Sequence, residues 1–313
     1  MSITLMTRSK QALHAIPRGR YVRLERFRQL DPELDYHEIY RDMVFKEFPW
    51  DITVGIQLGF YRNFAVPAIS TLLDRTGKMT NHTQRRLDDT GILLFEVINY
   101  GFGHERGMQA VRQMRRAHTA AERRVSTEGD KVRIPNEQFI YTLGTFFIPT
   151  LRWLDVYAWR PVCCHERAAT FHFYLEMGRR MGVKDIPTTL QNFIRWFDDY
   201  ERDHFAYHAA NERQWDATRT LLADMFVAWL PGFLAPAGRT FASAMANALL
   251  DAQLRTVLGV DHVSPILAQA VHLGMKARGR FVRWLPPREK PLYAGTLDTV
   301  TYPDGYNIAD IGL

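Results

Sequence analysis

The 313-residue sequence predicts an all-α protein folded as a single multi-helix domain. Three observations support this prediction. Apolar residues recur every three or four positions along most of the chain, which is the spacing of one face of an α-helix. The alternation of apolar and polar residues that is typical of half-buried strands is almost absent. No linker-like stretch divides the chain, although it is longer than the roughly 100–200 residues usual for one domain.

Ten segments show the helical spacing, and glycines and prolines separate most of them. Pro49, Gly77 and Pro187 are examples of residues that end or interrupt a helix. Two helix starts carry capping residues, because Asn81 precedes the third segment and Thr188 opens the seventh. The predicted helices span residues 37–48, 57–76, 82–100, 105–125, 135–148, 164–182, 188–209, 212–229, 238–257 and 262–283.

The two ends of the chain differ from this helical body. Residues 1–35 form a basic N-terminal arm. Within it, the stretch 8–28 carries Arg8, Lys10, Arg18, Arg20, Arg23, Arg26 and Arg28 against Glu25 alone. This stretch accounts for the whole net charge of +6, so the charge does not indicate a nucleic-acid-binding protein. Such an arm can touch a membrane surface or phosphate, but it is more often a solvated flank. Residues 36–313 form the helical domain, whose Pro-, Gly- and Tyr-rich end, 285–313, is expected to wrap around it as a loop.

The cysteine content and the apolar stretches of the sequence predict the cellular compartment. Cys163 and Cys164 are the only cysteines and are adjacent, which is typical of a reducing cytoplasm rather than of a disulfide framework. The N-terminus lacks the apolar core of a signal peptide. Pro149 and Pro231 interrupt the two most apolar stretches, which fall short of the ~20 residues that a membrane span needs. We therefore expect a soluble cytoplasmic protein, attached at most to a membrane surface.

One predicted helix places a histidine close to an arginine. Val111, Met114 or Arg115, and His118 fall on one helix face. Arg115 is thus expected within an apolar stripe one turn before His118, where a buried guanidinium needs an anion. A haem propionate, or oxygen bound at iron, would supply that anion. The alternative is a core histidine paired with a carboxylate beside a structural Arg115 salt bridge, and spacing alone favours this alternative.

A second predicted helix carries Arg86 and Thr90, four residues apart. Thr90 lies within its apolar stripe and Arg86 lies at the rim. A hydroxyl and a guanidinium that face a pocket can hydrogen-bond iron-bound oxygen or a propionate. The commoner alternative is a threonine hydroxyl bonded back to its own helix.

Other cofactor and metal motifs are incomplete. Glu201-x-x-His204 is half of a di-iron carboxylate motif, but the sequence holds no second Glu-x-x-His pair. His104-Glu105 and His165-Glu166 both lack the second histidine of a zinc-protease helix. The G-x-S-x-G, Walker A and dinucleotide fingerprints are absent. These gaps disfavour di-iron enzymes, zinc and serine hydrolases, and nucleotide-binding enzymes.

An ordered set of short motifs resembles the catalytic domain of the MpaB-like/rubber-oxygenase family, which includes latex-clearing protein. The resemblance covers roughly residues 40–310. The motifs are Arg75-Thr76-Gly77, Arg86-x-x-Asp89-Thr90, Arg115-x-x-His118, Ile134-Pro135-Asn136-Glu137-Gln138-Phe139, Arg152-Trp153, Trp159-Arg160, Glu166-Arg167-Ala168, Gly178-Arg179-Arg180-Met181-Gly182-Val183-x-Asp185-Ile186-Pro187, Tyr200-Glu201 and Tyr302-Pro303-x-Gly305-Tyr306.

The resemblance implies an all-α fold that encloses non-covalent haem b, with His118 as the iron ligand. It implies that Arg86, Arg115 and Arg160 also bind the cofactor. Arg86, Thr90 and Arg115 would form the catalytic group. The implied activity is a haem-dependent oxygenase that acts on an apolar, unsaturated or prenylated small molecule, with C=C cleavage by analogy. Dioxygen or peroxide would be the co-substrate, and the electron donor is not indicated.

The sequence departs from the family at two positions. Asp89 stands where the rubber oxygenases have a lysine across the haem, and no glutamate stands near Ser70 and Thr71 to act as a base. These departures argue against rubber itself as the substrate. Two alternative functions remain open at this point, a haem peroxidase or peroxygenase and a non-catalytic helical carrier of lipid or haem.

Overall fold

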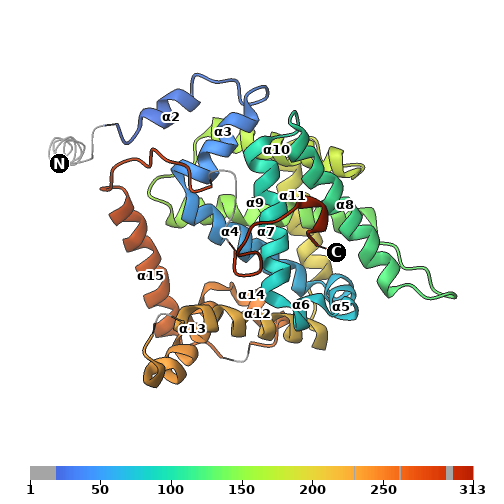
Figure 1. The fold of residues 1–313 in the computed structure, drawn as a ribbon. Coiled ribbons are helices and arrows are strands. Elements are labelled where there is room, and N and C mark those ends of the chain that lie inside the picture. Colours follow the sequence, from blue (N-terminus) through green and yellow to red (C-terminus); the bar gives the residue numbers. More distant parts are fainter. Residues whose placement is uncertain (1–18, 229, 261, 294–298, 313) are drawn as a thin grey trace.

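The structure is a computed structural model that describes residues 19–228, 230–260, 262–293 and 299–312. All regular elements in these ranges are helical, which confirms the predicted fold class (Figure 1). The elements are α2 Val22–Phe27, α3 Tyr36–Asp42, η1 Met43–Glu47, α4 Pro49–Arg62, η2 Asn63–Ala65, α5 Pro67–Thr76, α6 Lys78–Asn81, α7 Thr83–Tyr100, α8 Glu105–Val125, α9 Asn136–Tyr157, α10 Cys164–Met181, α11 Leu190–His204, α12 Ala209–Val227, η3 Gly232–Leu234, α13 Ala235–Leu249, α14 Ala252–Val257, α15 Pro265–Val282 and η4 Ile308–Asp310.

Helix α9 organises the core, because α4, α10, α11 and α15 all pack against it. Helices α7 and α8 pack side by side, and α8 also contacts α5 and α10. The main apolar cluster includes the fully buried rings of Phe147, Phe173 and Tyr174. A smaller cluster around Trp215 lies where α12 packs on α5. The helices that surround α8 and α9 thereby form the frame of the candidate site.

Prolines caused the main errors in the predicted helix boundaries. The helix predicted over 57–76 is two helices, because Pro67 begins α5 at a position where its missing N–H costs nothing. Pro49 likewise begins α4 and does not merely end the preceding helix. The helix predicted over 238–257 is also two, since the Asp251 side chain accepts the Leu254 N–H at 2.8 Å and caps α14.

Helix α9 continues through Pro149, which the sequence predicted would end it. A proline at this position leaves the Thr145 carbonyl without its usual partner four residues later. Gly59 of α4 lies against that carbonyl, so closely that a Cβ on Gly59 would be 1.8 Å from the Thr145 oxygen. The backbones of α4 and α9 therefore touch at the proline.

Even the longest apolar helices of the described chain do not meet the length and hydropathy that crossing a membrane requires.

The ends of the described chain pack against the helical body. Arg8, Lys10 and Arg18 of the predicted N-terminal arm lie outside the described residues. From residue 19 onward the arm is docked, with the Arg20 guanidinium 3.8 Å from the Trp159 ring centre and the Arg23 Nη1 2.6 Å from Glu47 Oε2. The C-terminal wrap passes across the helices (Figure 1), and its Tyr293 side chain is buried.

Candidate functional site

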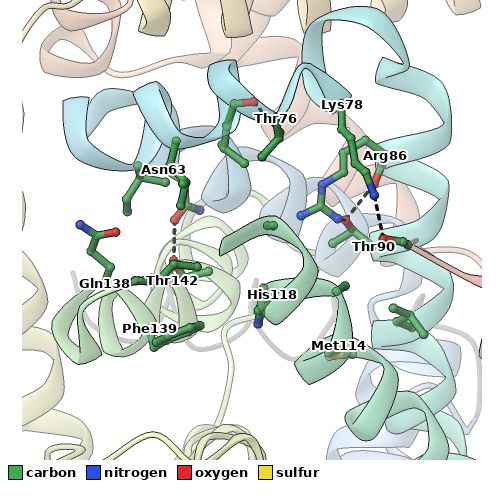
Figure 2. Close-up of a pocket in the computed structure, with 18 of the residues that line it drawn as sticks. Asn63, Thr76, Lys78, Arg86, Thr90, Met114, His118, Gln138, Phe139 and Thr142 are labelled. Carbon is green, nitrogen blue, oxygen red and sulfur yellow. Dashed lines mark hydrogen bonds between the residues drawn. The ribbon is translucent and has the colours of Figure 1, made fainter. Parts of the chain in front are cut away.

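A cavity of about 680 Å³ lies among α5, α6, α7, α8, α9 and α10 (Figure 2). Its volume falls within the roughly 300–1,000 Å³ of small-molecule and cofactor pockets. Most of its wall is apolar. None of the described residues that line it carries a carboxylate. The apolar lining residues are Phe60, Ile69, Leu72, Leu73, Met79, Leu93, Leu94, Met114, Ala117, Ala120, Ala121, Ile134, Phe139, Leu143, Phe146, Met177, Met181 and Val183.

His118 faces this cavity from α8 (Figure 2). Its ring lies 5.3 Å from the Phe139 ring, centre to centre, and no described residue hydrogen-bonds it. Burial, and after it the positive charge of Arg86, lowers the pKa of His118 from 6.5 to about 4. The imidazole is therefore neutral near pH 7. A neutral imidazole that faces a cavity with a free nitrogen lone pair is the state in which histidine binds a metal.

Arg86 faces the same cavity from α7. Its Nη1 donates to Thr90 Oγ1 at 2.9 Å, and that hydroxyl donates to the Arg86 carbonyl at 2.8 Å. The Thr90 hydroxyl thus bonds to its own helix, which is the commoner arrangement for a threonine. The same hydroxyl holds the Arg86 guanidinium in place. Within the described chain no carboxylate lies within ion-pair distance of Arg86, and burial lowers its pKa. The neighbouring Asp89 instead accepts the Tyr302 hydroxyl at 2.6 Å.

Three more basic side chains, Lys78, Arg123 and Arg124, line the cavity, and with Arg86 they form what we call the cationic wall. The Lys78 Nζ donates to the Gly312 carbonyl at 3.0 Å, and burial and the charge of Arg86 lower its pKa. The sequence analysis missed Lys78. Gly77 is the residue of the sequence that could have indicated Lys78, because glycine favours a turn. Its φ of +66° turns the chain so that Lys78 starts α6 beside Arg86.

The cavity also has a neutral polar patch on α4–η2 and α9. Thr142 Oγ1 donates to Asn63 Oδ1 at 2.9 Å, which joins the two elements. The Gln138 side chain lines the cavity nearby and makes no hydrogen bond within the described residues. Figure 2 shows these three residues on one side of His118 and the labelled part of the cationic wall on the other. The sequence analysis did not single out any of the three for function.

Arg115 does not join the site, so the prediction that it lies buried beside His118 is wrong. Its side chain is exposed and does not line the cavity. The inward face of α8 carries Met114, Ala117 and His118 instead. Each residue turns the helix by about 100°, so Arg115 points away from Met114 and toward solvent. The periodicity left Met114 and Arg115 as alternatives, and the apolar residue faces inward.

Arg160 is buried, but it lies outside the cavity lining, so the prediction that it binds the cofactor finds no support in its position. Its guanidinium binds two carboxylates. Arg160 Nη2 lies 2.7 Å from Glu47 Oε1 and 2.7 Å from Glu166 Oε1. Both carboxylates are buried, and Glu47 also binds Arg23, so the charge of Arg160 is satisfied within the fold. The Trp159-Arg160 motif thus serves the fold.

The half motif Glu201-x-x-His204 is also structural. Both Glu201 oxygens accept from Arg62, at 2.6 Å each, and the Tyr141 hydroxyl donates to Oε1 at 3.1 Å. His204 donates to the Tyr200 carbonyl at 2.9 Å. No group of three His, Cys, Asp or Glu side chains in the described ranges could hold a metal ion. His118 is therefore not part of a metal site built from several His, Cys, Asp or Glu side chains of the described residues.

Known proteins share this architecture. Residues 45–284 match the family described as ER-bound oxygenase mpaB/B'/Rubber oxygenase, catalytic domain. The chain is 27% identical over 271 residues to the ER-bound oxygenase mpaB' of Penicillium brevicompactum, which covers 81% of this chain and 60% of that protein. It is 25% identical over 236 residues to the ER-bound oxygenase mpaB of Penicillium roqueforti (strain FM164), covering 71% and 74%.

The fold is similar to that of latex clearing protein LCP in its closed state. The TM-score is 0.57 at 17% identity, over 88% of this chain and 72% of that one. This second likeness concerns the fold alone. The chain spans about 60% of the length of the mpaB' relative. The family match extends over well more than half of the chain, and the chain therefore belongs to the mpaB/rubber oxygenase catalytic-domain family.

Proposed function

We propose that this protein is a haem b-dependent oxygenase of an apolar, unsaturated or prenylated small molecule. The observation that carries the proposal is His118, a neutral and unbonded imidazole on the wall of a largely apolar cavity. Membership of an oxygenase family supports the reaction class. The apolar lining supports the substrate class, because a hydrocarbon chain gains about 25 cal/mol for each Å² that it buries.

The residues of the cavity fit a haem. His118 would bind the iron through its free lone pair, and Arg86 would bind a propionate, because it is a buried cation without a carboxylate partner among the described residues. Thr90 would act as a positioning residue, since its hydroxyl holds the Arg86 side chain. When bound, haem b would supply the activation of dioxygen or peroxide. The apolar walls would hold the substrate and exclude water.

The proposal is tested by the absorbance spectrum of the purified protein and a pyridine haemochrome assay. We expect a red-brown protein with about one b-type haem that acidified solvent extracts. A colourless protein that does not take up added hemin would refute the proposal. Dioxygen consumption by the reduced protein on addition of farnesol, compared with peroxide consumption, then separates an oxygenase from a peroxygenase and from a carrier without turnover.

Replacing Arg86 by methionine is expected to weaken haem binding by about 1.5–3 kcal/mol, the value of a hydrogen bond to a charged group. The stability of the haem-free protein should fall little, because Arg86 forms no ion pair within the described residues and interacts with Asp89 only through the field of its charge. Titration of the haem-free protein with hemin measures the first quantity, and urea unfolding measures the second. Arg115→Met is the matched control. Equal haem affinity in both variants would contradict the assignment.

The haem-free protein is expected to lose stability as the pH falls from about 6.5 to about 4. In this window the unfolded chain binds a proton at His118 while the folded chain does not, so protonation favours unfolding. The loss due to His118 should be at most roughly 3 kcal/mol. Urea unfolding of the wild type and His118→Gln across this range isolates the effect. Parallel pH profiles would show that folding does not lower the pKa of His118.

A further inference from the structure

Helix α15 presents an apolar stripe to the outside. The exposed fractions are 82% for Ile266, 58% for Leu273, 63% for Phe281 and 47% for Trp284, which follows the end of the helix. Ala270 and Ala277, between them in sequence, are exposed as well. At about 100° per residue, all six positions fall within a sector of roughly 80°. These six residues are named the α15 stripe.

The opposite face of α15 is anchored, so the stripe cannot turn inward without breaking packed contacts. Gly279 lies against α9, where an added Cβ would be 2.2 Å from the Tyr157 carbonyl oxygen. Arg278 Nη1 binds both oxygens of the buried Asp51 carboxylate, at 2.6 and 2.7 Å. The His272 ring hydrogen-bonds the Tyr157 hydroxyl. A fixed outward stripe of large apolar side chains marks an interaction surface.

The charges along the stripe are almost all positive. Lys276 and Arg280 are exposed beside it and take part in no ion pair within the described residues. Beyond the helix, Arg288 and Lys290 are exposed too. Glu289 is the single acidic residue between positions 262 and 290. A partner that binds the α15 stripe should therefore offer an apolar region to the stripe and negative charge to the basic residues beside it.

We propose that the α15 stripe docks on the surface of an anionic lipid bilayer. Phe281 and Trp284 would enter the boundary between headgroups and acyl chains, which is where these side chains settle in surface-bound helices. Lys276 and Arg280 would lie over the negative headgroups, each contributing a factor of about five in partitioning. A second copy of the chain fits less well, because a two-fold contact would bring the same basic residues together.

The neighbouring helix supports a broad contact. Helix α13 packs against α15, and its Phe241 is 51% exposed. Just before α13, Phe233 is 83% exposed and is the most exposed large apolar side chain of the described residues. Exposed aromatic side chains are thus also present on the elements that adjoin α15.

The test is co-flotation of the full-length protein with vesicles of phosphatidylcholine and phosphatidylserine in equal amounts, compared with phosphatidylcholine alone. We expect binding to the mixed vesicles and little binding to the neutral ones. Phe281→Ser with Trp284→Ser should lower the partition coefficient about tenfold or more, because two apolar side chains no longer enter the lipid. Lys276→Ala with Arg280→Ala should lower it roughly thirtyfold. All four positions are accessible at the surface, and haem content, which reports on His118, should not change.

Matched controls lie elsewhere on the surface. Leu34→Ser removes an apolar side chain that is 79% exposed, and Arg195→Ala removes an exposed charge; neither should alter flotation. If both α15 double variants bind vesicles as the wild type does, the proposal is overturned, and the basic N-terminal arm becomes the membrane contact. If the wild type ignores vesicles but sediments as a dimer that Phe281→Ser with Trp284→Ser dissociates, the stripe is a self-interface and the proposal fails.

Discussion

Replacing His118 by alanine is expected to abolish haem retention and to leave the fold intact. The iron would lose its bond to the protein, so only propionate contacts and apolar packing would hold the ring. The fold should persist, because the His118 ring makes no hydrogen bond within the described residues and faces a cavity. The pyridine haemochrome yield per protein measures haem retention, and far-ultraviolet circular dichroism checks the fold.

The control for this variant is a histidine outside the cavity. His204 stacks on Tyr200 at 4.0 Å between ring centres and hydrogen-bonds the backbone, so His204→Ala should keep the haem. The opposite pattern, in which His118→Ala shows a native haem spectrum and His204→Ala shows none, would mean that the iron ligand is wrongly assigned.

Replacing Arg160 by methionine is expected to lower the free energy of unfolding by about 3–5 kcal/mol, because removing one partner of a buried ion-pair group leaves charges uncompensated. The buried Glu166 carboxylate would lose its guanidinium, and the buried Glu47 carboxylate would keep only Arg23. Urea unfolding measures the effect. Haem affinity of the folded variant should match that of the wild type, because Arg160 does not line the cavity.

The matched control is an arginine of the same helical body at the surface. Arg152 and Asp198 form an ion pair in which both side chains are about half exposed, and such pairs contribute about 0–1 kcal/mol. Arg152→Met should therefore change stability little. Loss of haem from Arg160→Met without loss of stability would restore Arg160 to the cofactor site.

Much of the fold follows from local patterns. The predicted helices over 105–125 and 164–182 agree with α8 and α10 to within a residue, because their apolar spacing is regular and their ends carry breakers. Pro149 misled the prediction, since a proline usually ends a helix and the compensating contact with Gly59 lies far away in sequence. Such a contact is a property of the packed fold and has no local signature.

Some of the predicted site residues line the cavity and others do not. The resemblance pointed to His118, Arg86 and Thr90, and the structure brings all three to one cavity. Arg115 failed because helical spacing alone could not tell its orientation from that of Met114. Arg160 was expected at the cofactor but lies outside the cavity lining, because a buried arginine can satisfy its charge with core carboxylates as well as with a ligand. Lys78 went unnoticed because it comes from a four-residue helix with no periodicity of its own.

The contact between Gly59 and the Thr145 carbonyl has a consequence for engineering substrate scope. Phe60 of α4 lines one wall of the cavity, Thr142 and Phe146 of α9 line the adjoining wall, and these are the two helices that meet at this contact. Backbone atoms therefore set the spacing between these walls, and the side chains that line them do not. Replacing a lining residue such as Phe146 by a smaller one should enlarge the cavity without moving the helices. Any substitution of Gly59 adds a Cβ and would instead force α4 and α9 apart.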